Sequence, residues 1–410
     1  MRRLTFPLIL AALSFNHTTW SAELADSYDP FTLGDIELSS FYVFNAPMPH
    51  SAGMLLRQEP LGAIQSLDKA GVNLRILYSA TDGLTGTKIV PVSGALYLPP
   101  GDAPQGGWPL MAWTHGTVGI ADSCAPSWDG RQTQDETYLN RFLSEGYAVV
   151  ASDYQGLGTK GTHPYLATRP AAYSNLDAIT AVQRAGFPVS QKVGLFGQSQ
   201  GAGAAIATAA YAHAYAPEIA IVGVIATGPP YFTPRAIAAL ERMREPDKPD
   251  PFLGYSFLAM TLVQLEQPEF RMHNYVSHKA LPLAERVANT CYKDIKAQVR
   301  DAQLTYNQAF KASPSEALVA AFSAMGYPRL DLSVPIFIGT GGKDRDTPPR
   351  MQTALVMGLC QAGSRVQAHY YPELNHRQVV LASTVDSIPF LQTAFTGPPP
   401  EGNCAAQANH

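Results

Sequence analysis

The sequence predicts an α/β fold in which a mostly parallel central sheet is flanked by helices. Two observations support this prediction. Two long extended runs, Val72–Ala80 and Ile89–Leu98, are expected to form an antiparallel edge, and short apolar runs then alternate with helical stretches. Short, continuously apolar runs are typical of parallel strands buried on both faces. The apolar runs lie at 110–113, 148–152, 193–196, 220–226, 336–338 and 366–371, and helices are expected at 132–145, 172–185, 200–215, 350–361 and 376–394.

The composition of the 410-residue chain fits a large globular protein. Hydrophobic residues make up 46% of the chain and charged residues 15%, which excludes disorder and allows a large core. Lys and Arg number 29 against 33 Asp and Glu, a net charge of −4. Nucleic-acid-binding proteins usually carry a basic excess, so nucleic acid is not an expected partner.

The N-terminus has the features of a secretory signal peptide. Arg2 and Arg3 precede the apolar run 4–15, and small residues surround the expected cleavage after Ser21 or Ala22. The apolar run is too short for a transmembrane helix, which needs about 20 residues. The sequence therefore predicts a signal peptide at about 1–22 and a secreted or periplasmic protein without a transmembrane segment.

Export would place the four cysteines in an oxidising environment, where they can form two disulfides. Their three pairings are all open at this point. No two of the cysteines form a C-x-x-C pair, so the spacing predicts no metal site. The cysteines are Cys124, Cys291, Cys360 and Cys404.

One connection between the predicted strands is unusually long. About a hundred residues separate Thr227 from Val334, far more than an ordinary crossover. The apolar residues within it recur at helical spacing, so we expect a helical cap at 229–330, inserted between a first core part at 23–228 and a second at 331–410 with the C-terminal tail. Helices are expected at 235–244, 253–266, 280–300 and 315–324, and a loop-rich arm at 23–70.

The motif G-x-S-x-G at 197–201 is the sharpest chemical signal in the sequence. A short apolar strand ends directly in this motif and a helix of small residues begins after it. This is the context of a nucleophile elbow, in which a strained turn exposes a reactive serine. The motif therefore predicts that Ser199 is a nucleophile, and a serine nucleophile needs a base and an acid that orients the base.

The acid and then the base are expected to follow the serine along the chain. Asp344 lies in the glycine-containing turn after the strand at 334–339 and is the expected acid. Asp346 is the alternative, although it could also cap the helix opened by Pro348 or Pro349. Both acids could instead belong to one surface charge pair with Arg345.

Three of the ten histidines follow these acids. His369 lies inside a predicted strand, and His410 is the last residue. His376 lies in the loop after the last strand, where the base is expected, so we predict that it is the catalytic base.

Acyl transfer also needs two donors for the oxyanion. The first expected donor is the backbone N–H of Gln200, the residue after the nucleophile. The second is the backbone N–H of Gly116 or Thr117, in the loop after an earlier strand. His115 is expected to shape this loop rather than to act as a base.

Six segments form a pattern that is more specific than G-x-S-x-G alone. They are FYVFNAPMPHSAGMLLR at 41–57, AWTHGTVGIADSCAPS at 112–127, SDYQGLGTKGTHPYL at 152–166, GQSQGAG at 197–203, and the loops of Asp344 and His376. Together they resemble the secretory lipase family of the lipase-A type, within the α/β-hydrolase superfamily, and the resemblance runs from about residue 30 to the final helix. It implies an α/β-hydrolase core, a helical lid, the triad Ser199–Asp344–His376, disulfides Cys124–Cys291 and Cys360–Cys404, and ester hydrolysis without a metal or other cofactor.

The sequence thus predicts a secreted serine carboxylic-ester hydrolase, an esterase or lipase, that acts on a small-molecule or lipid ester through an acyl-enzyme intermediate. The alternatives on the same fold are a serine peptidase or amidase, an acyltransferase, and a non-catalytic binding protein. Apolar residues at 257–265 of the cap could pack in a core or face a lipid interface or acyl chain.

Overall fold

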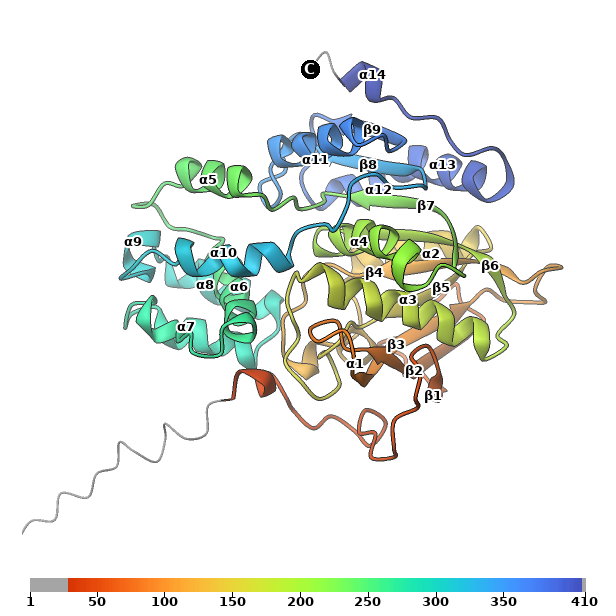
Figure 1. The fold of residues 1–410 in the computed structure, drawn as a ribbon, viewed down its shortest axis with the longest axis horizontal. Coiled ribbons are helices and arrows are strands. Elements are labelled where there is room, and N and C mark those ends of the chain that lie inside the picture. Colours follow the sequence, from red (N-terminus) through yellow and green to blue (C-terminus); the bar gives the residue numbers. More distant parts are fainter. Residues whose placement is uncertain (1–28, 408–410) are drawn as a thin grey trace, which may run out of the picture.

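The computed structural model describes residues 29–407, in which one nine-stranded sheet carries helices on both faces (Figure 1). The predicted signal peptide lies outside these residues. Strands β4 to β9 run parallel, whereas β1, β2 and β3 form the antiparallel edge, so the predicted fold class is confirmed. In spatial order the strands are β1 (Leu55–Pro60), β2 (Val72–Thr81), β3 (Ile89–Leu98), β5 (Ala148–Ser152), β4 (Trp108–Thr114), β6 (Val189–Gln198), β7 (Ala220–Thr227), β8 (Ile336–Gly341) and β9 (Val366–Tyr371).

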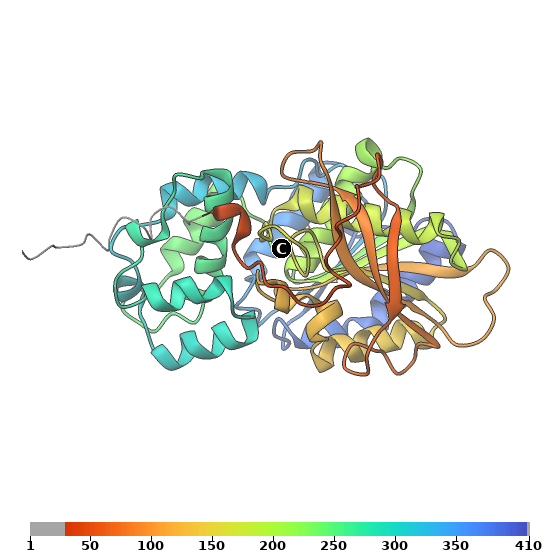
Figure 2. The same cartoon turned by 90° about the horizontal axis from the view of Figure 1, so that it is seen from below.

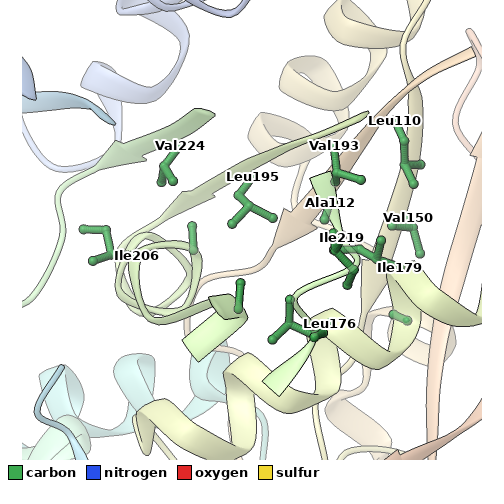
Figure 3. Close-up of a cluster of buried hydrophobic side chains, with 14 of the residues drawn as sticks. Leu110, Ala112, Val150, Leu176, Ile179, Val193, Leu195, Ile206, Ile219 and Val224 are labelled. Carbon is green, nitrogen blue, oxygen red and sulfur yellow. The ribbon is translucent and has the colours of Figure 1, made fainter. Parts of the chain in front are cut away.

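The continuously apolar strands are explained by burial on both faces of the sheet. Leu110 and Ala112 of β4 pack with α3 and α4 on one face, as Figure 3 shows, while Met111 and Trp113 pack with α2 and α13 on the other. Successive side chains of a strand point to opposite faces, so a strand covered on both sides needs apolar residues at every position. The core helices are α1 (Pro126–Asp129), α2 (Thr133–Ser144), α3 (Thr168–Arg184), α4 (Gln200–Tyr215), α11 (Pro349–Gln361), α12 (Gln378–Ala382), α13 (Thr384–Thr396) and α14 (Cys404–Gln407), with short 3-10 turns η1 (Pro30–Thr32) and η2 (Asp122–Cys124).

Strand β1 lies within the arm that was expected to be rich in loops. It pairs with β2 at the edge of the sheet, and the register shifts between Leu55 and Arg57. An edge strand tolerates a terminal proline such as Pro60, because one side of the strand makes no ladder. The segment LLRQEP has no regular alternation of apolar and polar residues, so the sequence pattern did not reveal this strand.

The connection between β7 and β8 contains the cap helices, α5 to α10, which lie beside one end of the sheet in Figures 1 and 2. They enclose an apolar core of their own. Phe257, Leu258 and Val263 are fully buried in it, so these side chains pack inside the cap and not on its surface. The domain boundaries at 229 and 330 stay predictions. The cap elements are α5 (Pro234–Met243), α6 (Leu253–Glu266), η3 (Met272–Asn274), α7 (Leu281–Glu285), η4 (Arg286–Ala288), α8 (Tyr292–Ala302), α9 (Tyr306–Ala309) and α10 (Ser315–Ala324).

The prediction of one continuous helix at 280–300 was wrong, because the structure divides this segment into α7, η4 and α8. The interruption coincides with two contacts to the core. Cys291, the N-cap of α8, is bonded to Cys124, and the N–H of Tyr292 donates to the carbonyl oxygen of Val118 at 2.7 Å. These contacts fix the start of α8 beside the loop that follows β4.

The second disulfide joins Cys360 in α11 to Cys404 in α14. It attaches the C-terminal segment to the helix beside β9. Both pairings are those that the family resemblance implies. Within residues 29–407, no helix combines the length and apolar character that crossing a membrane requires.

Candidate active site

Ser199 occupies a strained turn between β6 and α4. Its backbone has φ 59° and ψ −124°, a conformation that costs energy for any residue other than glycine. A Cβ atom at Gly201 would lie 1.9 Å from the carbonyl oxygen of Thr114, and one at Gly197 would lie 2.1 Å from the Thr114 hydroxyl oxygen. The two glycines of the motif therefore allow β6 and α4 to pack against β4 while the turn carries Ser199.

His376 and Asp344 form a buried hydrogen-bonded pair. Nδ1 of His376 lies 2.7 Å from Oδ2 of Asp344, whose side chain has no exposed surface. The carboxylate also accepts hydrogen bonds from the backbone N–H of Thr347 and the side-chain amide of Gln352, both at 2.9 Å. These donors orient the carboxylate, which in turn holds Nδ1 of His376 as the protonated nitrogen.

The second ring nitrogen of His376 is buried and has no hydrogen-bond partner within residues 29–407. In a neutral ring that donates Nδ1–H to Asp344, the lone pair is on Nε2. Ser199 and His376 line the same cleft, although no hydrogen bond joins them in the part of the chain that is described. The structure thus places a nitrogen base in the cleft that contains the strained serine.

The position of His376 depends on the residues around it. The side chain of Asn375 accepts from the N–H groups of Arg377 and Gln378 at 3.0 Å, so α12 begins after His376 and leaves it in a turn. The helix expected at 376–394 therefore starts two residues late, and it divides into α12 and α13. Gly228, with φ +61°, packs against the ring, and a Cβ atom there would lie 2.8 Å from its Cε1.

The loop after β4 places Gly116 and Thr117 in the cleft. His115 is buried with Nδ1 2.7 Å from the carbonyl oxygen of Gly116 and Nε2 3.1 Å from that of Asp153, and burial lowers the pKa of His115. The peptide bond between Gly116 and Thr117 is trans, so the Thr117 N–H points away from the carbonyl that faces His115. His115 thus shapes the loop, as expected from the sequence.

Neither Gly116 nor Thr117 donates its N–H to a protein acceptor within the described residues. The N–H of Gln200 belongs to the first turn of α4 and has no partner inside the helix. Gly116 and Thr117 thus share the cleft with Ser199, Gln200 follows Ser199 in the chain, and all three backbone N–H groups are candidate donors to an oxyanion.

Asp346 was the alternative acid, and it makes different contacts. It accepts a hydrogen bond of 2.8 Å from the hydroxyl of Tyr255 and lies 3.9 Å from Nζ of Lys296, both in the cap. Asp346 does not cap α11, the other role considered for it, since no side chain of the described residues makes that cap hydrogen bond. An ion pair with Arg345 is likewise not formed.

Asp344, Asp346 and His376 each offer an atom within 4.8 Å of the others, a spacing that could hold a metal ion. The atoms already have partners that account for this spacing. His376 and Asp344 bond to one another, and the Lys296 ammonium supplies positive charge beside Asp346. The arrangement fits a base and its orienting acid better than a set of metal ligands.

The cleft over Ser199 has a volume of about 470 Å³. It lies at the carboxyl ends of β4, β6, β8 and β9, where α/β sheets usually bind ligands. Val118 is the one aliphatic side chain among the described residues that line it. The lining consists of Gly116, Thr117, Val118, Gln132, Gln134, Asp135, Gln198, Ser199, Tyr255, Tyr292, Lys293, Lys296, Lys343, Arg345, Asp346, Asn375, His376 and Arg377.

The sequence did not single out Thr347, Gln352 or Gly228. Thr347 stands three residues after Asp344 in the same loop, a local signal for a side chain that supports the acid. Gln352 lies one helical turn into α11, and Gly228 follows a different strand, so their contacts with Asp344 and His376 depend on the tertiary fold.

The fold and the cleft define an α/β-hydrolase. Within this class, the family model of the secretory lipases matches residues 126–403, and the chain belongs to that family. A curated relative, lipase A of Moesziomyces aphidis, is 25% identical over 276 residues. That match covers 64% of this chain and 57% of the relative, so the chain spans little more than half the length of that protein.

Solved structures share the fold at low sequence identity. Candida antarctica lipase A is 20% identical with a TM-score of 0.70, covering 86% of this chain and 84% of its own. The rice cell wall degrading esterase LipA from Xanthomonas oryzae is 19% identical with a TM-score of 0.66, covering 84% and 98%. A putative hydrolase from Legionella pneumophila is 17% identical with a TM-score of 0.66, covering 85% and 100%.

Proposed function

We propose that the protein is a secreted serine carboxylic-ester hydrolase with Ser199, His376 and Asp344 as its triad. The observation that carries the proposal is the 2.7 Å hydrogen bond between His376 and Asp344 in a cleft that also contains Ser199 on its strained turn. Membership of the secretory lipase family supports ester hydrolysis. The printed names of the relatives, lipases and an esterase, agree with it.

The mechanism follows from the placement of these side chains. Nε2 of His376 takes the proton of the Ser199 hydroxyl while the serine oxygen attacks the ester carbonyl. Asp344 holds the imidazole in the correct tautomer and stabilises the cation. The protonated His376 then gives its proton to the leaving alcohol, and an acyl-serine remains. Water, deprotonated by His376, attacks this intermediate and releases the carboxylic acid.

The negative charge of each tetrahedral intermediate needs two fixed donors. The N–H of Gln200 supplies one, at the positive end of the α4 dipole. We assign the second to Thr117, because the hydrogen bond between His115 and the carbonyl oxygen of Gly116 turns the Thr117 N–H away from His115. Gly116 remains the alternative donor.

A peptidase that binds a substrate amine needs an acidic anchor in its cleft. Here basic side chains outnumber acidic ones among the lining residues, which disfavours a peptidase of this kind.

Two disulfides and the family support secretion. N-terminal sequencing of the mature protein from the culture medium or periplasm would locate the cleavage expected after residue 21 or 22.

The direct test of the proposed function is the Ser199→Ala variant, with Ser144→Ala at the exposed end of α2 as a matched control. We expect Ser199→Ala to reduce hydrolysis of p-nitrophenyl butyrate by about 10⁴-fold or more and to abolish labelling by a fluorophosphonate probe. A non-catalytic binding protein would be unlabelled in both variants. Retention of ester hydrolysis by Ser199→Ala would refute the proposal.

A further inference from the structure

The cleft over Ser199 carries the opposite charge to the chain as a whole. Five lining residues are basic and two, Asp135 and Asp346, are acidic, so the lining has three more positive than negative side chains. The whole chain has a net charge of −4. A cleft lined by one sign of charge focuses the field and raises the local concentration of ligands of the opposite charge. The basic residues are Lys293, Lys296, Lys343, Arg345 and Arg377.

The three lysines already have acidic partners. Lys343 pairs with Glu373 at 2.5 Å, Lys293 with Asp129 at 3.0 Å, and Lys296 lies 3.9 Å from Asp346. When the partners outside the lining, Glu373 and Asp129, are included, one net positive charge remains. The unmatched positive charge of the cleft therefore rests on its two arginines.

Neither arginine has an ion pair within residues 29–407. Arg345 makes no hydrogen bond to another residue there, and Arg377 uses Nε to donate to the neutral side chain of Gln134 at 3.1 Å. Burial raises the pKa of Asp135, the acidic lining residue without an ion-pair partner, to about 6, and the charges of Arg131 and Arg377 oppose this rise. Asp135 therefore attracts Arg377 at neutral pH but forms no ion pair with it, and both guanidinium groups keep N–H donors for a ligand.

The two arginines follow the acid and the base directly in the sequence. Arg345 comes after Asp344 and Arg377 after His376, and both line the cleft that contains Ser199. The buried hydrogen bond between His376 and Asp344 holds together the two loops that carry the arginines, so both arginines line one cleft with Ser199. A guanidinium binds carboxylate and phosphate groups through two parallel hydrogen bonds.

The cap side of the cleft is held in place. The disulfide Cys124–Cys291 and the hydrogen bond from the Tyr292 N–H to Val118 fix the start of α8. The rings of Tyr255 and Tyr292 stack at 4.6 Å between centroids and give the polar cleft an aromatic wall. This polar and basic lining suits a charged ester better than a long aliphatic chain.

We propose that the preferred substrate is an ester with an anionic group, a carboxylate or a phosphate, on the part of the molecule that Arg345 and Arg377 contact. This inference rests on the proposed ester hydrolysis and names its substrate class. The arginines would lower KM for such an ester, because they bind a group that does not take part in the reaction.

The test compares esters that differ only in charge. Mono-p-nitrophenyl glutarate carries a free carboxylate, and its methyl ester is the neutral counterpart. We expect kcat/KM to be about 10-fold higher for the anionic ester, mainly through KM, because hydrogen bonds to charged groups are stronger than neutral ones. The preference should fall as salt concentration rises. Pentanoate and butyl phosphate, tested as competitive inhibitors, distinguish a carboxylate site from a phosphate site.

Arg345→Gln and Arg377→Gln should each lower the ratio of anionic to neutral kcat/KM by several-fold, whereas Arg350→Gln, an exposed arginine of α11 outside the cleft, should leave that ratio unchanged. Equal kcat/KM for the two esters, or a ratio that neither cleft variant changes, would overturn the inference while ester hydrolysis stands. Failure of the parent protein to hydrolyse either ester would overturn the proposed function and the inference with it.

Discussion

The hydroxyl of Tyr255, in the cap helix α6, donates a hydrogen bond of 2.8 Å to Asp346, which lies two residues beyond Asp344. Burial raises the pKa of Tyr255, so the phenol remains protonated and acts as the donor. Asp344 instead accepts from His376. Two neighbouring carboxylates therefore make separate contacts: Asp344 holds His376, the proposed base, and Asp346 joins the loop that carries both acids to the cap.

This division of roles predicts unequal effects of carboxylate-to-amide substitutions. Asp344→Asn should lower kcat for p-nitrophenyl butyrate by about 10³- to 10⁴-fold, because the imidazole loses the partner that fixes its tautomer. Asp346→Asn should lower it by less than about 10-fold, since it weakens one contact with the cap. Tyr255→Phe removes the same contact from the other side and should match Asp346→Asn. If Asp346→Asn lost more activity than Asp344→Asn, the assignment of the acid would be wrong.

The two disulfides should differ in their effect on activity. Replacing either pair by serines should lower the free energy of unfolding by about 2–4 kcal/mol, because the unfolded chain gains freedom. Loss of Cys124–Cys291 should also raise KM, because this bond fixes the start of α8 over the cleft. Loss of Cys360–Cys404 should leave KM unchanged, because this bond only attaches the C-terminal segment.

Urea unfolding and steady-state kinetics on the two double variants would measure both quantities. The Cys360→Ser/Cys404→Ser protein serves as the control for a general loss of stability. A similar rise in KM in both double variants would contradict a specific role of Cys124–Cys291 at the cleft.

The parts of the fold that local sequence determines were predictable. The G-x-S-x-G motif specifies its turn because a side chain at either glycine would collide with β4. The two glycines are therefore visible in the sequence as a signal for this turn. The interruption before α8 was not predictable, since the disulfide that accompanies it joins residues 167 positions apart. The helical periodicity of 280–300 continues across the break, so periodicity alone predicts one helix.

The placement of the candidate site residues was predictable to the same extent. Ser199 and His376 each occupy the position that chain order and the preceding strand indicate. The choice between Asp344 and Asp346 could not be settled from the sequence, because both lie in one loop and differ only in what they contact. In the structure His376 bonds to Asp344, whereas Asp346 bonds to the cap residue Tyr255, which lies 91 positions away in the sequence.

Asp122 should make stability depend on pH. Burial, opposed in part by the hydrogen bond from the Ile36 N–H, raises the pKa of Asp122 to about 7 from an ordinary value of 3.8. Between these values the folded state holds a proton that the unfolded state has released, so this group destabilises the fold progressively as pH rises from about 4 to 7. Asp122→Asn removes the charge and keeps an acceptor for Ile36.

We therefore expect Asp122→Asn to be more stable, relative to the parent, at pH 8 than at pH 5. The difference should be at least about 1 kcal/mol, since one pKa unit corresponds to about 1.4 kcal/mol. Urea unfolding at both pH values measures it, with the exposed Asp102→Asn as the control. An identical effect of Asp122→Asn at the two pH values would show that Asp122 does not titrate in this range.

Gly201 should tolerate no side chain, even though it lies in the first turn of a helix, where alanine usually stabilises. A Cβ atom at this position would lie 1.9 Å from the carbonyl oxygen of Thr114 and 2.7 Å from that of His115, and both are backbone atoms that cannot rotate away. Gly201→Ala must therefore separate α4 from β4, which moves both Ser199 and the loop of Thr117. We expect a large fall in kcat/KM and a destabilisation of at least about 2 kcal/mol, as for other overpacked core positions.

Gly203→Ala, two residues further along α4, is the matched control. The nearest atom to its new Cβ would be a ring carbon of Pro230 at 3.2 Å, so a small shift of that side chain relieves the contact. Thermal unfolding and p-nitrophenyl butyrate hydrolysis, measured on both variants, separate the two cases. If Gly201→Ala unfolded at the same temperature as Gly203→Ala and kept its activity, the close approach of α4 to β4 would not be what positions the nucleophile.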